Sequence, residues 1–130
     1  MVLSLNRSCM LESANIQTGV GFMYSVQEID VAELKSMQAE GKNFRLLDVR
    51  NIAEIQRGCI EGCEPVPLNI LQAKLPDLSN DETYILYCHS GARSAQATSF
   101  MVNQGYHETY NLKGGILAWA QQGFEIAALA

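Results

Sequence analysis

The stretch TYILYCHSGARS, residues 83–94, decides the fold class of this 130-residue chain. Its first part, Thr83 to Tyr87, is β-branched, aromatic and aliphatic without a breaker, as is typical of a buried strand. A short loop follows in which Gly91 permits a positive φ, and Ser94 is expected to cap a helix that runs to about Gln104. The stretch therefore predicts a strand, a tight loop and a helix in direct succession.

Strands and helices alternate along the chain on both sides of this stretch. We expect extended segments at 44–49, 64–68 and 108–111, and helices at 31–40, 51–56, 69–74 and 114–123. Such alternation is typical of an α/β fold, in which helices cover both faces of a mostly parallel sheet. Ligands bind these sheets beyond the carboxyl ends of the strands, so the loop at 88–94 is the expected site.

Length and composition fit one folded domain. The chain is 48% hydrophobic and 18% charged, which excludes a disordered or collagen-like protein. We expect the domain to span residues 24–130, after a flexible leader at residues 1–23. A transit peptide is the alternative interpretation of the leader.

The charge and cysteine patterns exclude several function classes. Fourteen acidic and nine basic residues give a net charge of −5, and the basic residues form no stripe, which argues against nucleic-acid binding. No apolar run reaches the ~18 residues of a membrane span. The four cysteines, at positions 9, 59, 63 and 88, form no CxxC pair, so we expect no metal site and a reducing, cytoplasmic compartment.

The loop after the central predicted strand begins with the candidate catalytic residue, Cys88. The N–H groups of a small loop can turn inward around its sulfur, and the following helix adds the positive potential of its N-terminus. Arg93 adds a full charge, so these surroundings lower the pKa of the thiol and suit an anionic substrate. The alternative is a buried strand-end cysteine without a role, which the presence of Gly91, Arg93 and Ser94 in the same loop disfavours.

Five short motifs follow one another along the chain. They are LLDVR at 46–50, GCIEG at 58–62, PL at 67–68, YCHSGARS at 87–94 and LKGGILAW at 112–119. Each is weak alone, but in this order they resemble the single-domain rhodanese family of sulfurtransferases. The resemblance covers residues 24–130.

This resemblance implies a rhodanese-like α/β fold with a sheet of about five strands and a sulfur-transfer reaction. Cys88 would attack a small sulfur-containing anion such as thiosulfate and carry its sulfur as a persulfide to a thiol, to cyanide or to a protein acceptor. No metal or organic cofactor is implied, and the oligomeric state is left open. The active-site loop that the family implies consists of Cys88 with His89, Ser90, Gly91, Ala92, Arg93 and Ser94. Arg93 would either orient the anionic donor or tie the loop to the sheet.

Two other functions compete with this interpretation. The related cysteine phosphatases and arsenate reductases have five residues between cysteine and arginine, whereas four separate Cys88 from Arg93. The shorter loop suits a sulfur better than a tetrahedral phosphate. The other competitor is a module that binds a partner or accepts sulfur from one. Cys88 argues against an inert module, but His89 leaves delivery of sulfur by a partner open, since members active on thiosulfate often have a basic residue at that position.

Three residues outside the loop are candidate supporting groups: Asp48, Arg50 and Cys59. Asp48 and Arg50, together with Glu54, are interpreted as a structural salt-bridge network rather than an acid–base set. Cys59 replaces the histidine of the family's GHI motif, so it is either a resolving thiol that forms a disulfide with Cys88 or Cys63, or a small packed residue. The packed residue is the favoured interpretation.

Overall fold

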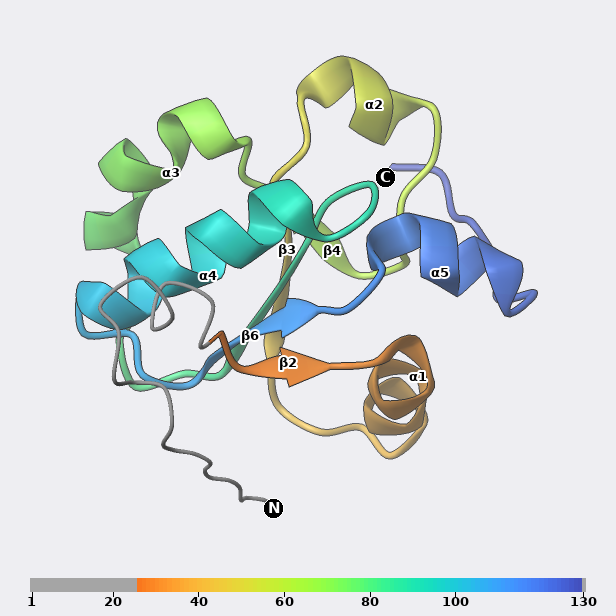
Figure 1. Ribbon diagram of the computed structural model, residues 1–130, viewed down its shortest axis with the longest axis horizontal. Helices are drawn as coiled ribbons and strands as arrows, with labels where there is room; N and C mark the ends of the chain where they lie inside the picture. Colours follow the sequence, from red (N-terminus) through yellow and green to blue (C-terminus); the bar gives the residue numbers. More distant parts are fainter. Residues whose placement is uncertain (1–25, 130) are drawn as a thin grey trace, which may run out of the picture.

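A five-stranded parallel sheet forms the centre of the described part of the chain, residues 26–129 of the computed structural model (Figure 1). The strand order is β2-β6-β5-β3-β4. The strands are β2 (Glu28–Ile29), β3 (Arg45–Asp48), β4 (Cys63–Pro65), β5 (Tyr84–Tyr87) and β6 (Thr109–Leu112). The helices are α1 (Val31–Ala39), α2 (Ile52–Gln56), α3 (Leu68–Lys74), α4 (Ala92–Asn103) and α5 (Gly115–Gln121), with a 3-10 turn at Leu75–Asp77. The predicted α/β fold is confirmed, while the predicted leader at 1–23 lies outside the described residues.

Helices cover both faces of the sheet because successive side chains of a strand point to opposite faces. Leu46 and Ile85 pack on one face with residues of α1 and α5, whereas Leu47 and Leu86 pack on the other with residues of α3 and α4. Figure 1 shows these two helix pairs on opposite sides of the strands. All four residues of β5 are buried, as expected of a central strand covered on both faces.

Two local features differ from the sequence-based expectation. The strand β2 was not predicted, because two residues carry no period and the strand exists only through its pairing with β6. The prediction that Ser94 caps a helix is wrong. The helix α4 begins at Ala92, and its N-cap is Gly91, whose φ of +106° is accessible to glycine at little cost. Ser94 is instead fully buried in the first turn.

All the strands run in the same direction, so the segments that leave them meet at one edge of the sheet. The loop after β5, the start of α2 after β3 and the start of α5 after β6 all lie at this carboxyl edge. The start of α2 is fixed by a capping box, in which Asn51 and Glu54 bond each other's backbone N–H groups. Between residues 26 and 129, no helix has the length and apolar character of a membrane span.

Candidate active site

The sulfur of Cys88 lies directly beyond β5 and is surrounded by hydrogen-bond donors. Cys88 is only 1% exposed. Its Sγ accepts the N–H of Gly91 at 3.1 Å and the N–H of Ser94 at 3.4 Å, and the Ser94 hydroxyl lies 3.4 Å away. The structure thus places the amides of the loop around the sulfur, as the sequence predicts for a site that holds a thiolate.

The loop takes this shape because α5 binds its carbonyl groups. The N–H of Ile116 donates to the carbonyl of Cys88 at 2.9 Å, and the N–H of Leu117 donates to the carbonyl of His89 at 3.0 Å. This approach requires glycine at position 115, where φ is +61° and a Cβ atom would lie 2.5 Å from the Cys88 carbonyl oxygen. With its carbonyls bound to α5, the loop can turn its N–H groups toward the sulfur. The sequence analysis did not assign this role to Gly115.

Hydrogen bonds lower the pKa of the Cys88 thiol below its ordinary value. Burial is the largest single influence and raises the pKa, but the Ser94 hydroxyl and the N–H groups of Ser94, Gly91 and Arg93 together outweigh it. The thiolate is the nucleophilic form of cysteine. The surroundings of Cys88 therefore favour the form that can attack a sulfur donor.

Arg93 is bound to α2 rather than free at the mouth of the site. Its guanidinium donates to both carboxylate oxygens of Glu54, at 2.8 and 3.0 Å. The hydrogen bonds from Arg93 are the largest influence on Glu54 and lower its pKa to about 2. The pKa of Arg93 is raised, chiefly by the same hydrogen bonds and to a smaller extent by Cys88. Arg93 therefore ties the loop to α2, not to the sheet as the second predicted role had it.

Asp48 and Arg50 form a buried ion pair at the end of β3. The Arg50 guanidinium donates to both oxygens of the Asp48 carboxylate, at 2.7–3.1 Å, and to the carbonyl of Gly58 at 2.7 Å. The pair holds the segment after α2 against the sheet, which agrees with the structural interpretation of these residues. Glu54 forms its direct ion pair with Arg93 and interacts with Arg50 only through the longer-range attraction of their charges.

Cys59 is buried and its side chain contacts Cys63. Its backbone forms a two-way bridge with Ala127, with N–H···O distances of 2.9 and 2.7 Å. Burial, with a smaller contribution from the Cys59 contact, raises the pKa of Cys63 to about 12. Both cysteines are free, as is Cys88. A disulfide between Cys59 and either of the other two stays a prediction.

Asn111 belongs to the site but was missed by the sequence analysis. It lies in β6, is 1% exposed, and its side-chain oxygen accepts the hydroxyl of Ser94 at 2.5 Å. Its amide nitrogen donates to the carboxylate of Glu28 at 3.0 Å. An amide within a buried strand is an unusual polar group, and this was the only signal in the sequence that could have indicated it.

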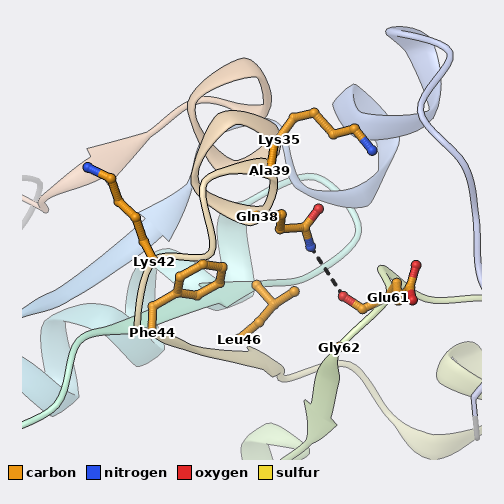
Figure 2. A pocket seen from close by; sticks show the side chains of 8 residues that line it. All are labelled: Lys35, Gln38, Ala39, Lys42, Phe44, Leu46, Glu61 and Gly62. Atoms are coloured by element: carbon orange, nitrogen blue, oxygen red, sulfur yellow. Dashed lines mark hydrogen bonds between the residues drawn. The ribbon is translucent and has the colours of Figure 1, made fainter.

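The remaining loop residues, His89, Ser90 and Ala92, are exposed beside the buried nucleophile. Within residues 26–129, no three His, Cys, Asp or Glu side chains are placed to hold a metal ion. A hollow of about 470 Å³ lies between α1 and the segments before β3 and β4 (Figure 2). It is lined by Lys35, Gln38, Ala39, Lys42, Phe44, Leu46, Glu61 and Gly62. None of these residues belongs to the Cys88 loop, so the hollow is separate from the candidate active site.

Comparison with known families identifies the family of the chain. The rhodanese-like domain family matches residues 30–122, which include the Cys88 loop and most of the sheet. The chain belongs to this family. The predicted resemblance to single-domain rhodaneses is thereby confirmed.

Relatives of known structure or curated name agree with the family. A "Sulfurtransferase" from Allochromatium vinosum is 38% identical over 103 residues, which cover 79% of this chain and 96% of that protein. A rhodanese-related protein from Thermoplasma volcanium has a TM-score of 0.71 at 29% identity, covering 78% of this chain and 97% of that one.

Some relatives are much longer. The "Probable adenylyltransferase/sulfurtransferase MoeZ" of Mycobacterium tuberculosis is 35% identical over 69% of this chain, which spans only 24% of that protein. The family and the sulfurtransferase relatives together support a sulfur-transfer role for this rhodanese-like domain.

Proposed function

We propose that this rhodanese-like domain transfers sulfane sulfur through a persulfide on Cys88. One observation carries the proposal: the Cys88 sulfur lies among inward-turned N–H groups, including those of Gly91 and Ser94. These groups stabilise a thiolate, and they suit the anion of a persulfide for the same reason. Because the reaction needs a free thiolate, the proposal also favours a reducing compartment such as the cytoplasm.

The proposed reaction has two steps, in each of which one bond to the transferred sulfur forms and one breaks. The Cys88 thiolate attacks the outer sulfur of thiosulfate, the S–S bond of the donor breaks, and sulfite leaves with the electron pair. An acceptor such as cyanide or a thiolate then attacks the outer sulfur of the persulfide, and the Cys88 thiolate is released. Kinetics of the ping-pong type are expected from such a covalent intermediate.

The loop itself would bind the donor. Both guanidinium N–H groups of Arg93 that face α2 are committed to Glu54, and Arg93 remains 39% exposed. We therefore assign Arg93 to fixing the loop, with a long-range attraction for anions as a secondary effect. The exposed His89 lies next to Cys88, where a donor or acceptor must approach.

A phosphatase or arsenate reductase activity is the less favoured enzyme. Only four residues separate Cys88 from Arg93, and two of the N–H groups that a phosphate would need are already directed at the sulfur. Hydrolysis of a small aryl phosphate at a rate above background by wild-type protein, absent in Cys88→Ser, would overturn this assignment.

Mass spectrometry of the intact, reduced protein tests the main proposal. Incubation with thiosulfate is expected to add the mass of one sulfur atom, cyanide or a dithiol is expected to remove it, and Cys88→Ser is expected to gain nothing. The matched control is Cys63→Ser, which is expected to load like the wild type. Loading of Cys88→Ser would contradict the assignment of the nucleophile.

A protein-fed sulfur relay is the second candidate function, and the surface around the site favours it. Among residues 26–129, the exposed large apolar side chains are Ile52, Leu68, Ile70, Leu117 and Ile126. Four of them lie in the first turns of α2, α3 and α5, which begin at the carboxyl edge of the sheet. The fifth side chain, Ile126, packs against Gly58. The carbonyl of Gly58 accepts a hydrogen bond from Arg50 at the end of β3. An apolar rim of this kind suits a protein that presents or receives sulfur at Cys88.

Comparison of donors separates the two candidates. If thiosulfate fails to load Cys88 while a polysulfide or a persulfidated desulfurase succeeds, the relay is supported. In that case Leu117→Ser is expected to slow loading by the protein donor and leave loading by the polysulfide unchanged. Equal effects on both donors would argue against docking at the apolar rim.

A further inference from the structure

A chain of hydrogen-bonding groups leads from the nucleophile to the surface of the sheet. The Ser94 hydroxyl lies 3.4 Å from the Cys88 sulfur and 2.5 Å from the side-chain oxygen of Asn111. The amide nitrogen of Asn111 donates to the Glu28 carboxylate at 3.0 Å. Ser94 and Asn111 are buried, whereas Glu28 is exposed on β2 at the edge of the sheet.

The Ser94 hydroxyl cannot donate to both of its neighbours at once, because a hydroxyl carries a single hydrogen. Asn111 is the nearer acceptor by 0.9 Å, from 2.5 and 3.4 Å. If the hydroxyl turned to the sulfur, the buried oxygen of Asn111 would lose this donor, and an unsatisfied buried acceptor is costly. Asn111 therefore competes with Cys88 for the hydrogen of Ser94.

Glu28 determines which end of the Asn111 amide faces Ser94. A carboxylate only accepts hydrogen bonds, so it binds the amide nitrogen and turns the amide oxygen toward the serine. In the opposite orientation the amide oxygen would face the negative charge of Glu28, and the amide nitrogen would donate to Ser94. The hydroxyl would then be free to donate to the Cys88 sulfur. The charge on β2 thus acts on the nucleophile through two intermediate side chains.

We propose that Asn111 is a positioning residue for sulfur transfer, which competes with the Cys88 sulfur for the hydrogen of Ser94 and so weakens the donation from this hydroxyl to the sulfur, with Glu28 fixing the orientation of the amide. The inference rests on the proposed function, since the group it adjusts is the proposed nucleophile. Each donor to a thiolate stabilises it but also weakens its nucleophilicity, so weakening one donor keeps the sulfur reactive. Hydrogen-bond distances and burial support this series of contacts from Cys88 to Glu28. It involves neither the Arg93–Glu54 pair nor the Asp48–Arg50 pair.

The test measures the pH dependence of Cys88 alkylation by iodoacetamide, followed on the Cys88 peptide by mass spectrometry. Asn111→Leu removes the competing acceptor at similar volume, so the midpoint of alkylation is expected to fall by roughly half a unit to one unit. Glu28→Gln lets the amide turn and is expected to produce a smaller shift in the same direction. This second variant changes an exposed side chain, so it decides the question if Asn111→Leu does not fold.

Two further variants separate positioning from general destabilisation. In a Ser94→Ala background, Asn111→Leu is expected to leave the midpoint unchanged, because no hydroxyl hydrogen remains to be released. Thr109→Val is the matched control, since Thr109 is another buried polar residue of β6 and its hydroxyl donates to the carbonyl of Tyr106, away from the site. It is expected to lower the Tm without moving the alkylation midpoint.

Three results for the alkylation midpoint of Cys88 would refute the proposed role of Asn111. A midpoint that stays fixed or rises in folded Asn111→Leu, or in Glu28→Gln if the first variant does not fold, would refute it. So would a shift of equal size in the Ser94→Ala background. Sulfur loading of the same variants is measured in parallel by intact mass. Failure of the wild type to load from any donor would refute the proposed function, whereas the alkylation midpoints would still decide the role of Asn111.

Discussion

Cys88 follows β5 and Cys63 lies in β4, with β3 between these strands, and the surroundings of the two thiols shift their pKa values in opposite directions. Cys88 is the more buried, at 1% exposure, yet its pKa is lowered by the donors that outweigh its burial. Cys63 is only partly buried, yet burial without sufficient donors raises its pKa to about 12. The comparison indicates that aligned donors, rather than exposure, set the direction in which the pKa of each of these two thiols is shifted.

The largest expected effect comes from removing one thiol at a time. Cys88→Ser is expected to abolish sulfur loading from thiosulfate or polysulfide, whereas Cys63→Ser is expected to retain it, because only Cys88 has the surroundings of a thiolate. Intact mass after incubation with the donor measures the loading. A comparable loss of sulfur loading in both variants would contradict the prediction that Cys88 alone of these two cysteines carries the sulfur.

A second prediction concerns the rates at which the two wild-type thiols react. At neutral pH, iodoacetamide is expected to modify Cys88 at least tenfold faster than Cys63, because each unit of pKa changes the thiolate fraction about tenfold. As the pH rises toward about 12, the rate at Cys63 is expected to climb while that at Cys88 levels off. Peptide-resolved mass spectrometry measures both rates in one sample. Faster modification of Cys63 at neutral pH would show that exposure governs reactivity after all.

The donors around Cys88 depend on the close contact with α5, which a single methyl group would disrupt. Gly115→Ala is expected to destabilise the fold by about 1–3 kcal/mol, since the new Cβ would collide with the carbonyls of Cys88 and His89 at a positive φ. Sulfur loading is expected to slow as the loop amides lose their alignment. Thermal unfolding and loading rates check the two effects. As a control, Gly41→Ala has a similar φ of +68° but no neighbouring atoms, so it is expected to lose stability without slowing the loading.

The smallest expected effect concerns the ion pair that holds the loop to α2. Glu54 has a pKa of about 2, below its ordinary 4.5, because Arg93 stabilises its charged form. The stabilisation is therefore complete above about pH 4.5 and is lost as the pH falls toward 2. Since both side chains are partly exposed, it is expected to amount to about 0.5–1 kcal/mol.

Denaturant unfolding of wild type and Glu54→Gln at several pH values measures this contribution. The difference in unfolding free energy between the two proteins is expected to be present at pH 6 and to shrink as the pH is lowered below about 4. A difference that does not depend on pH would show that the charge pairing of Glu54 with Arg93 does not account for the loss, since Gln at position 54 can keep the capping bonds with Asn51.

Much of the fold and the centre of the site could be predicted from local sequence. The run from Thr83 to Tyr87 becomes β5, and the glycine at position 91 adopts the predicted positive φ. Asp30 caps α1, a contact that involves only residues a few positions apart and is therefore readable from local sequence. The prediction for Ser94 was wrong because the N-cap lies three residues earlier, at Gly91, where a glycine replaces the usual side-chain cap.

Other parts of the site depend on which segments become neighbours. Asn111 contacts Ser94 across 17 residues of sequence and Glu28 contacts Asn111 across 83, while Gly115 lies against the carbonyls of Cys88 and His89, so no local pattern relates these residues to the loop. The partner of Arg93 was also missed, since Glu54 comes from a different strand-to-helix segment.

The sequence by itself determined the alternation of strands and helices, the position of the candidate nucleophile and the family to which the chain belongs, because these depend on residue type and spacing. The tertiary structure decided the strand order, which sets β6 and β3 on either side of β5. That order brings α5 to the carbonyls of the loop and Asn111 to Ser94. The physical reason is that a thiolate is stabilised by donors at hydrogen-bond distance, and such distances between remote residues exist only once the sheet has formed.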